Sequence, residues 1–158
     1  MKKIDNIIFK VVYVICAILM GLMAVVITAQ VLSRYILDSP LTWSEELGRF
    51  TFVWISFLGM AVGIKQGAHI ALDLLVTKLK GVSKKTLMLI NNALVALFAV
   101  IFTYSGFLLV ELGSRQTSPS LNLPMNLVYM VIPISGIILF YFVVSGTIQM
   151  FQRKGDSV

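Results

Sequence analysis

The chain of 158 residues contains one cysteine, Cys16, and one histidine, His69. A single thiol excludes an internal disulfide, and the lone histidine leaves only Met as a companion ligand for a membrane haem. The sequence also lacks a glycine-rich phosphate loop, a metal-ligand spacing and a nucleophile placed beside a base. We therefore expect no enzyme activity, and no metal or cofactor held by this chain.

Charged residues are scarce as well, at 13% of the chain against 58% hydrophobic residues, and the mean hydropathy is +0.93. This composition is too apolar for a soluble domain, so we expect an all-α membrane protein. A helix needs about 20 apolar residues to cross a bilayer. We predict a single bundle over residues 1–158, with transmembrane helices at about 7–36, 43–66, 86–111 and 126–150.

The basic residues predict the orientation of these spans. All but three of the 13 lie before or in the first turn of the first span, at the end of the second span or between it and the third, or after the fourth. The three exceptions are Arg34, Arg49 and Arg115. The positive-inside rule then places both termini in the cytoplasm. The net charge of +6 suits anionic lipid head groups, so we expect membrane lipids as partners and no nucleic acid.

Polar residues recur at every third or fourth position from His69 to Lys80, with leucines and valines between them. This spacing is typical of a short amphipathic helix in the membrane interface, which we predict at about 69–80 on the inner side. Asp73 is the only carboxylate near His69 in sequence. We therefore interpret His69 as a polar-face residue and not as a ligand or proton shuttle.

The second predicted span begins with a charged turn. Thr42 is a candidate N-cap with Glu45 as its capping-box partner, and either Glu45 or Glu46 can form an ion pair with Arg49. Trp43 fits the aromatic belt at the membrane interface. Two interpretations of the carboxylates stay open and are compatible: local capping with an ion pair, or contact with another subunit.

Small residues follow on the same span at intervals of three and four. They are Ser56, Gly59, Gly63 and Gly67. Such a stripe lets the backbone of another helix come close, so we predict an assembly surface. A similar stripe runs from Ala17 to Thr28 in the first span, whereas Trp54 faces either lipid or a packed surface.

The longest irregular stretch is 116–125, on the outer side. Its prolines, Pro119 and Pro124, favour an extended path. We predict that this loop is a docking surface, with Gln116 and Ser118 as further contact residues. In the fourth span, Pro133 predicts a kink.

The central parts of the four spans contain no ionisable group except Cys16 and tyrosines such as Tyr104 and Tyr141. Carriers of protons or charged substrates usually keep an acidic or basic residue in the membrane. We therefore expect that this chain does not carry a substrate alone. An autonomous small carrier or channel remains the alternative, and an anchor subunit of a membrane redox complex is a third possibility.

One ordered series of residues extends along nearly the whole chain. It consists of Arg34-Tyr35, Trp43-Ser44-Glu45-Glu46, Arg49, Trp54, Phe57-Leu58-Gly59, His69, Gln116, Ser118-Pro119, Pro124, Tyr129 and Pro133. In order and spacing it resembles the small, Q-type, four-helix membrane subunit of TRAP (tripartite ATP-independent periplasmic) transporters.

The resemblance implies a scaffold in the bacterial inner membrane for a larger, multispan, sodium-coupled symport subunit of the elevator type, served by a periplasmic substrate-binding protein. Sodium and substrate are expected on the large subunit, and substrates of the family are organic acid anions such as sialic acids and small dicarboxylates. Trp43, Glu45, Glu46, Arg49 and His69 carry over as interface positions. Because the chain ends at Val158, we expect the large subunit to be a separate polypeptide.

Overall fold

The structure, a computed structural model, describes residues 2–36, 38–39, 41–66 and 82–152. Its helices are α1 (Lys2–Ile36), α2 (Thr42–Lys65), α4 (Val82–Gly113), α5 (Met125–Tyr129) and α6 (Val131–Gln152). Besides helices, these ranges contain one isolated β-bridge, between Thr117 and Pro124.

Four helical segments are long and apolar enough to cross a membrane. They are Lys3–Ile36, Thr42–Lys65, Thr86–Gly113 and Met125–Met150. In lipid a helix is favoured because it satisfies its own backbone hydrogen bonds. The expectation of an all-α membrane protein with four spanning helices is confirmed to this extent. The predicted interfacial helix at 69–80, including His69, lies outside the described residues, as does Gly67.

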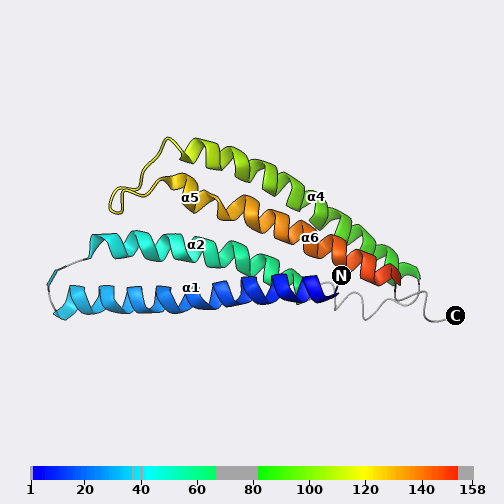
Figure 1. Ribbon diagram of the computed structural model, residues 1–158, viewed down its shortest axis with the longest axis horizontal. Coiled ribbons are helices and arrows are strands. Elements are labelled where there is room, and N and C mark those ends of the chain that lie inside the picture. The colour runs from blue at the N-terminus through cyan, green and yellow to red at the C-terminus, as the bar shows by residue number, and fades with distance from the viewer. Residues whose placement is uncertain (1, 37, 40, 67–81, 153–158) are drawn as a thin grey trace.

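The helices form a row in which α1 packs against α2, α2 against α6, and α6 against α4 (Figure 1). α1 with α2 and α4 with α6 make two antiparallel hairpins. Along the helix axes, the hairpins converge at the end of the bundle where the N-terminus lies. We call this the N-terminal end, and the opposite end, with the start of α2 and residues 114–124, the loop end. The edge helices leave large apolar side chains uncovered, among them Val25 at 67% and Leu94 at 60% exposure.

The two hairpins meet in an apolar core between α1, α2 and α6. Its buried members are Val12, Leu58, Val62 and Val131. Trp54 is partly buried against this cluster, so of its two predicted environments the packed one is observed. Phe57 of α2 also contacts Phe102 of α4, with ring centroids 5.4 Å apart.

Glycines allow α4 and α6 to approach each other closely. A Cβ added to Gly106 would lie 2.8 Å from the backbone nitrogen of Pro133, and one added to Gly136 would overlap the Thr103 hydroxyl. By contrast, an added Cβ on Gly21 or Gly59 meets nothing within 4 Å. Within the described chain, the small-residue positions predicted for assembly on α1 and α2 are therefore open at these two glycines.

The helix of the fourth span is interrupted at Met130, between α5 and α6. Pro133 has no N–H to donate to the carbonyl of Tyr129, four residues earlier, and its ring crowds that carbonyl. Hydrogen bonding resumes from Ile134 to the Met130 carbonyl, at 3.3 Å. The helix is thus interrupted on the N-terminal side of the proline for which a kink is predicted.

Candidate functional site

A pocket at the loop end brings together the two groups of polar residues that the sequence singled out. The start of α2 contributes Thr42, Glu45, Glu46, Arg49 and Phe50, and the loop contributes Gln116, Thr117, Ser118, Pro119, Ser120 and Met125. The pocket has a volume of about 680 Å³. We call it the loop-end pocket. Trp43 and Pro124 do not line it.

Glu46 attaches this loop to α2. Its carboxylate accepts hydrogen bonds from the backbone N–H groups of Leu121, at 2.9 Å, and Ser120, at 3.1 Å. The side chain is buried, with 7% exposure. Hydrogen bonds to an ionised acceptor are stronger than neutral ones, so Glu46 fixes one wall of the pocket.

The loop folds back on itself, which corrects the extended path predicted from its prolines. The N–H of Ser118 donates to the Leu123 carbonyl at 2.9 Å, and the N–H of Met125 donates to the Gln116 carbonyl at 2.9 Å. The reversal passes through Asn122, whose φ of 50° lies in the left-handed region that asparagine tolerates better than most residues. Pro124 itself keeps the extended backbone that its ring favours, and the chain reverses at the turn before it.

The predicted capping box and ion pair at the start of α2 are both wrong. The N-cap is Leu41, without a side-chain cap bond, and the Ser44 hydroxyl donates to the Leu41 carbonyl at 2.6 Å. Glu45 accepts a long hydrogen bond from Gln30 of α1, at 3.4 Å. In the part of the chain that the structure describes, Arg49 forms no ion pair with Glu45 or Glu46. The Glu46 carboxylate is directed to the loop backbone, and Glu45 to Gln30 of α1.

A second polar cluster lies at the N-terminal end and was missed in the sequence. Asp5 of α1 is fully buried and accepts hydrogen bonds from Tyr141, Ser145 and Gln149 of α6, at 2.7, 2.6 and 2.6 Å. Lys65 of α2 lies 3.4 Å from the same carboxylate. We call these five residues the Asp5 cluster. A signal was present, since Tyr141, Ser145 and Gln149 are spaced by four and share one helix face.

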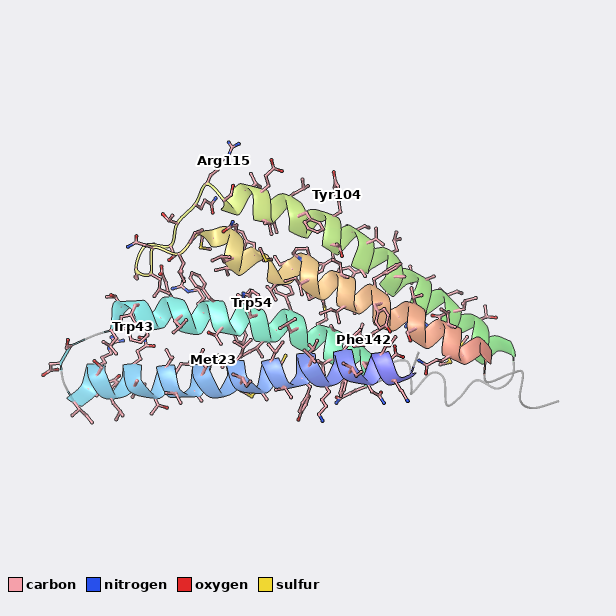
Figure 2. The ribbon with its side chains drawn as sticks, viewed as in Figure 1. Met23, Trp43, Trp54, Tyr104, Arg115 and Phe142 are labelled. Carbon is pink, nitrogen blue, oxygen red and sulfur yellow. The ribbon has the colours of Figure 1, made fainter. Side chains whose placement is uncertain are left out.

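Lys65 is also held by an aromatic ring. Its ammonium lies 5.4 Å from the ring centroid of Phe142, which Figure 2 places where α6 approaches α1 and α2. A cation over an aromatic face is stabilised by the ring quadrupole. Lys65 therefore has a defined partner in the fold, beyond the contribution to membrane orientation expected from the sequence.

The small residues of the α2 stripe neither line the loop-end pocket nor belong to the Asp5 cluster. Ser56 is exposed and donates to the Phe52 carbonyl of its own helix at 2.8 Å, while Gly59 and Gly63 are half-buried. Nothing in the described chain fills the space beside Gly59. Apart from Trp43 and the undescribed His69, the predicted interface positions therefore fall into two places, the loop-end pocket and this α2 face.

Comparison with known proteins identifies the family. Residues 23–153 match the family described as "Tripartite ATP-independent periplasmic transporters, DctQ component". The chain belongs to the DctQ family. It is thus a small membrane subunit of the TRAP type, part of a transporter and not of an enzyme.

Three curated relatives of this DctQ-family chain illustrate the range of the family. The C4-dicarboxylate TRAP transporter small permease protein DctQ of Rhodobacter capsulatus is 36% identical over 65% of this chain and 46% of that protein. The sialic acid TRAP transporter small permease protein SiaQ of Vibrio cholerae is 29% identical over 83% and 81%. The isethionate TRAP transporter permease protein DctMQ of Oleidesulfovibrio alaskensis is 33% identical over 73% and 20%. The chain therefore spans less than half of the first and a fifth of the third.

Proposed function

We propose that this chain is the scaffold subunit of a bacterial inner-membrane TRAP transporter. In this role it supports a larger, sodium-coupled permease subunit of the elevator type, which takes up an organic acid anion delivered by a periplasmic binding protein. Membership of the DctQ family supports the transporter class. The sodium coupling and the elevator motion are part of the proposal.

The open row of helices is the observation that carries this proposal. A row one helix thick cannot bury its own apolar faces, and both edge helices expose large apolar side chains. The open space beside Gly21 and Gly59 allows a helix of another protein to approach closely. We infer that the large permease subunit covers part of this surface and that membrane lipids cover the rest.

The proposed orientation has the loop end in the periplasm and both termini in the cytoplasm. Lys3, Lys10 and Lys65 lie toward the N-terminal end, and basic residues favour the cytoplasmic side. The loop-end pocket then faces the periplasm. We propose that the binding protein docks there, against the exposed residues Arg49, Gln116 and Pro119. Ser118, predicted from the sequence as a contact residue, is not part of this surface, because it is buried at 1% exposure and its hydroxyl accepts a hydrogen bond from the Leu123 N–H inside the loop.

Substrate choice is proposed to reside outside this chain. Relatives named for C4-dicarboxylate, sialic acid and isethionate are 29–36% identical to it over 65–83% of this chain. The features shared with all three relatives therefore do not specify one substrate. An organic anion such as a sialic acid or a small dicarboxylate is the class that we propose.

The scaffold proposal is tested by purifying the chain from native membranes in mild detergent at high salt and identifying the proteins that stay attached by mass spectrometry. A large multispan permease should remain attached to the chain. Reconstitution then provides the second readout: uptake into proteoliposomes should require the permease and the binding protein together with this chain. Uptake by the chain alone would overturn the proposal in favour of an autonomous carrier.

A further inference from the structure

Two buried carboxylates join the two helix hairpins, one at each end of the row. At the N-terminal end, Asp5 of the first hairpin bonds to three side chains of α6. At the loop end, Glu46 of the first hairpin bonds to the loop that connects α4 with α5. Between them, the hairpins meet through apolar contacts such as those of Leu58 with the cluster that contains Val131.

We propose that Asp5 and Glu46 are positioning residues that clamp the two hairpins at a fixed angle, so that the small subunit behaves as one rigid body. The inference rests on the proposed scaffold function, because a support for a moving partner must resist deformation. Neither residue is assigned a role in transport by the family match.

Apolar contacts alone leave the angle between the hairpins weakly defined. In a bilayer, lipid tails compete with side chains for such contacts, so no hydrophobic driving force fixes one helix against another. Hydrogen bonds are directional, and an unpaired buried charge is costly. The two ends of the row therefore contain the contacts that best define its geometry.

The Asp5 cluster constrains α6 in two ways. Its three donors occupy positions 141, 145 and 149, which span about 12 Å along the helix axis. A slide of α6 along α1 would lengthen some of these bonds, and a rotation would turn the donor face away. Lys65 adds α2 to the same carboxylate, so three helices meet at this point.

The Glu46 clamp depends on the backbone of its partner and not on side chains. Both donors are main-chain N–H groups, of Ser120 and Leu121. Substitution of Ser120 by alanine keeps the donor and provides a matched control. Glu45 provides a second control, because this adjacent carboxylate bonds to Gln30 within its own hairpin.

Distances between spin labels on the two hairpins test the clamps in the full chain. With Cys16 replaced by alanine, labels at the exposed positions Val11 and Ile148 report on the N-terminal end, and labels at Tyr35 and Leu112 report on the loop end. Asp5→Ala should widen or shift the first distance distribution, and Glu46→Ala the second. Asn6→Ala, Glu45→Ala and Ser120→Ala should change neither.

Folding and function are measured on the same variants. Should Asp5→Ala fail to fold, Tyr141→Phe removes one donor and is compared with Tyr104→Phe, at an exposed position on α4. Clamp variants that still bind the large permease should show lower uptake than Asn6→Ala, a control outside the loop-end pocket, because the support now bends. Narrow, unshifted distances in folded Glu46→Ala and Asp5→Ala, or in Tyr141→Phe, would overturn the clamp.

The two proposals fail in different ways. If no permease binds the wild-type chain, the scaffold function is wrong, whereas the label distances still report whether the carboxylates fix the hairpins. If the permease binds and transports but the distances are insensitive to both substitutions, only the clamp is wrong.

Discussion

The hydroxyl of Tyr141 donates a 2.7 Å hydrogen bond to the carboxylate of Asp5, 136 positions earlier in the chain. This bond places the first turns of α1 beside the second half of α6, although α2 lies between the two helices over most of the row. The N-terminal segment is therefore part of the folded unit, which has consequences for stability.

Asp5→Asn should destabilise the chain in detergent by about 1–3 kcal/mol, since Lys65 loses its charge partner and Tyr141, Ser145 and Gln149 lose part of their acceptor. Thermal unfolding followed by circular dichroism measures the change. The double variant Asp5→Asn with Lys65→Met should lose less, because it removes the unpaired ammonium as well. Equal melting of the single variant and the wild type would contradict the prediction.

Gly106→Ala should destabilise the packing of α4 against α6. The added Cβ would lie 2.8 Å from Pro133, and overpacking of this kind costs about 1–3 kcal/mol. Gly21→Ala is the matched control, because its Cβ meets open space and alanine favours a helix. The melting temperature should fall for the first variant only, and the same value for both would show that the α4–α6 seam is looser than described.

Gly59→Leu and Gly63→Leu should weaken association with the large permease if α2 presents the proposed interface. The expected result is less permease in the co-purified complex, with the unfolding temperature of the isolated Gly59 variant unchanged, since that position is open. Gly146→Leu, at another open position on α6, serves as the control. Normal assembly and transport in both α2 variants would exclude this face.

Arg49→Ala should leave stability unchanged and reduce the affinity for the binding protein. Arg49 lines the loop-end pocket without an ion pair in the described part of the chain, so its charge is available to a partner. A loss of up to about fivefold is expected for one exposed charge pair, and salt should reduce the difference. Titration of the binding protein onto reconstituted complex measures it.

Arg115→Ala is the control for that titration, because this side chain points away from the row, as Tyr104 does (Figure 2). The proposal for the pocket fails if both arginine variants bind the partner as the wild type does.

The four spanning helices were predictable because the requirement for crossing a bilayer is local. A long apolar run satisfies it whatever its neighbours are, so hydropathy alone locates Lys3–Ile36 and Thr86–Gly113. The packed environment of Trp54 was anticipated as one of two alternatives. The interruption of the helix at Met130 lies just before Pro133, the residue for which a kink was predicted.

The polar contacts were harder to predict because they depend on residues distant in sequence. Asp5 and Tyr141 belong to opposite ends of the chain, and a search for charges in the middle of each span passes over a carboxylate near a helix start. Glu46 was singled out from the sequence but paired with the wrong partner, since local spacing favoured Arg49 and the loop backbone is 74 and 75 positions away.

The bonds from Glu46 to main-chain N–H groups separate the shape of the loop from the identity of its side chains. Any residue except proline at positions 120 and 121 presents the same two donors. A subunit built in this way can exchange the side chains at the tip of its loop, and so meet a different soluble partner, while the path of the backbone is preserved.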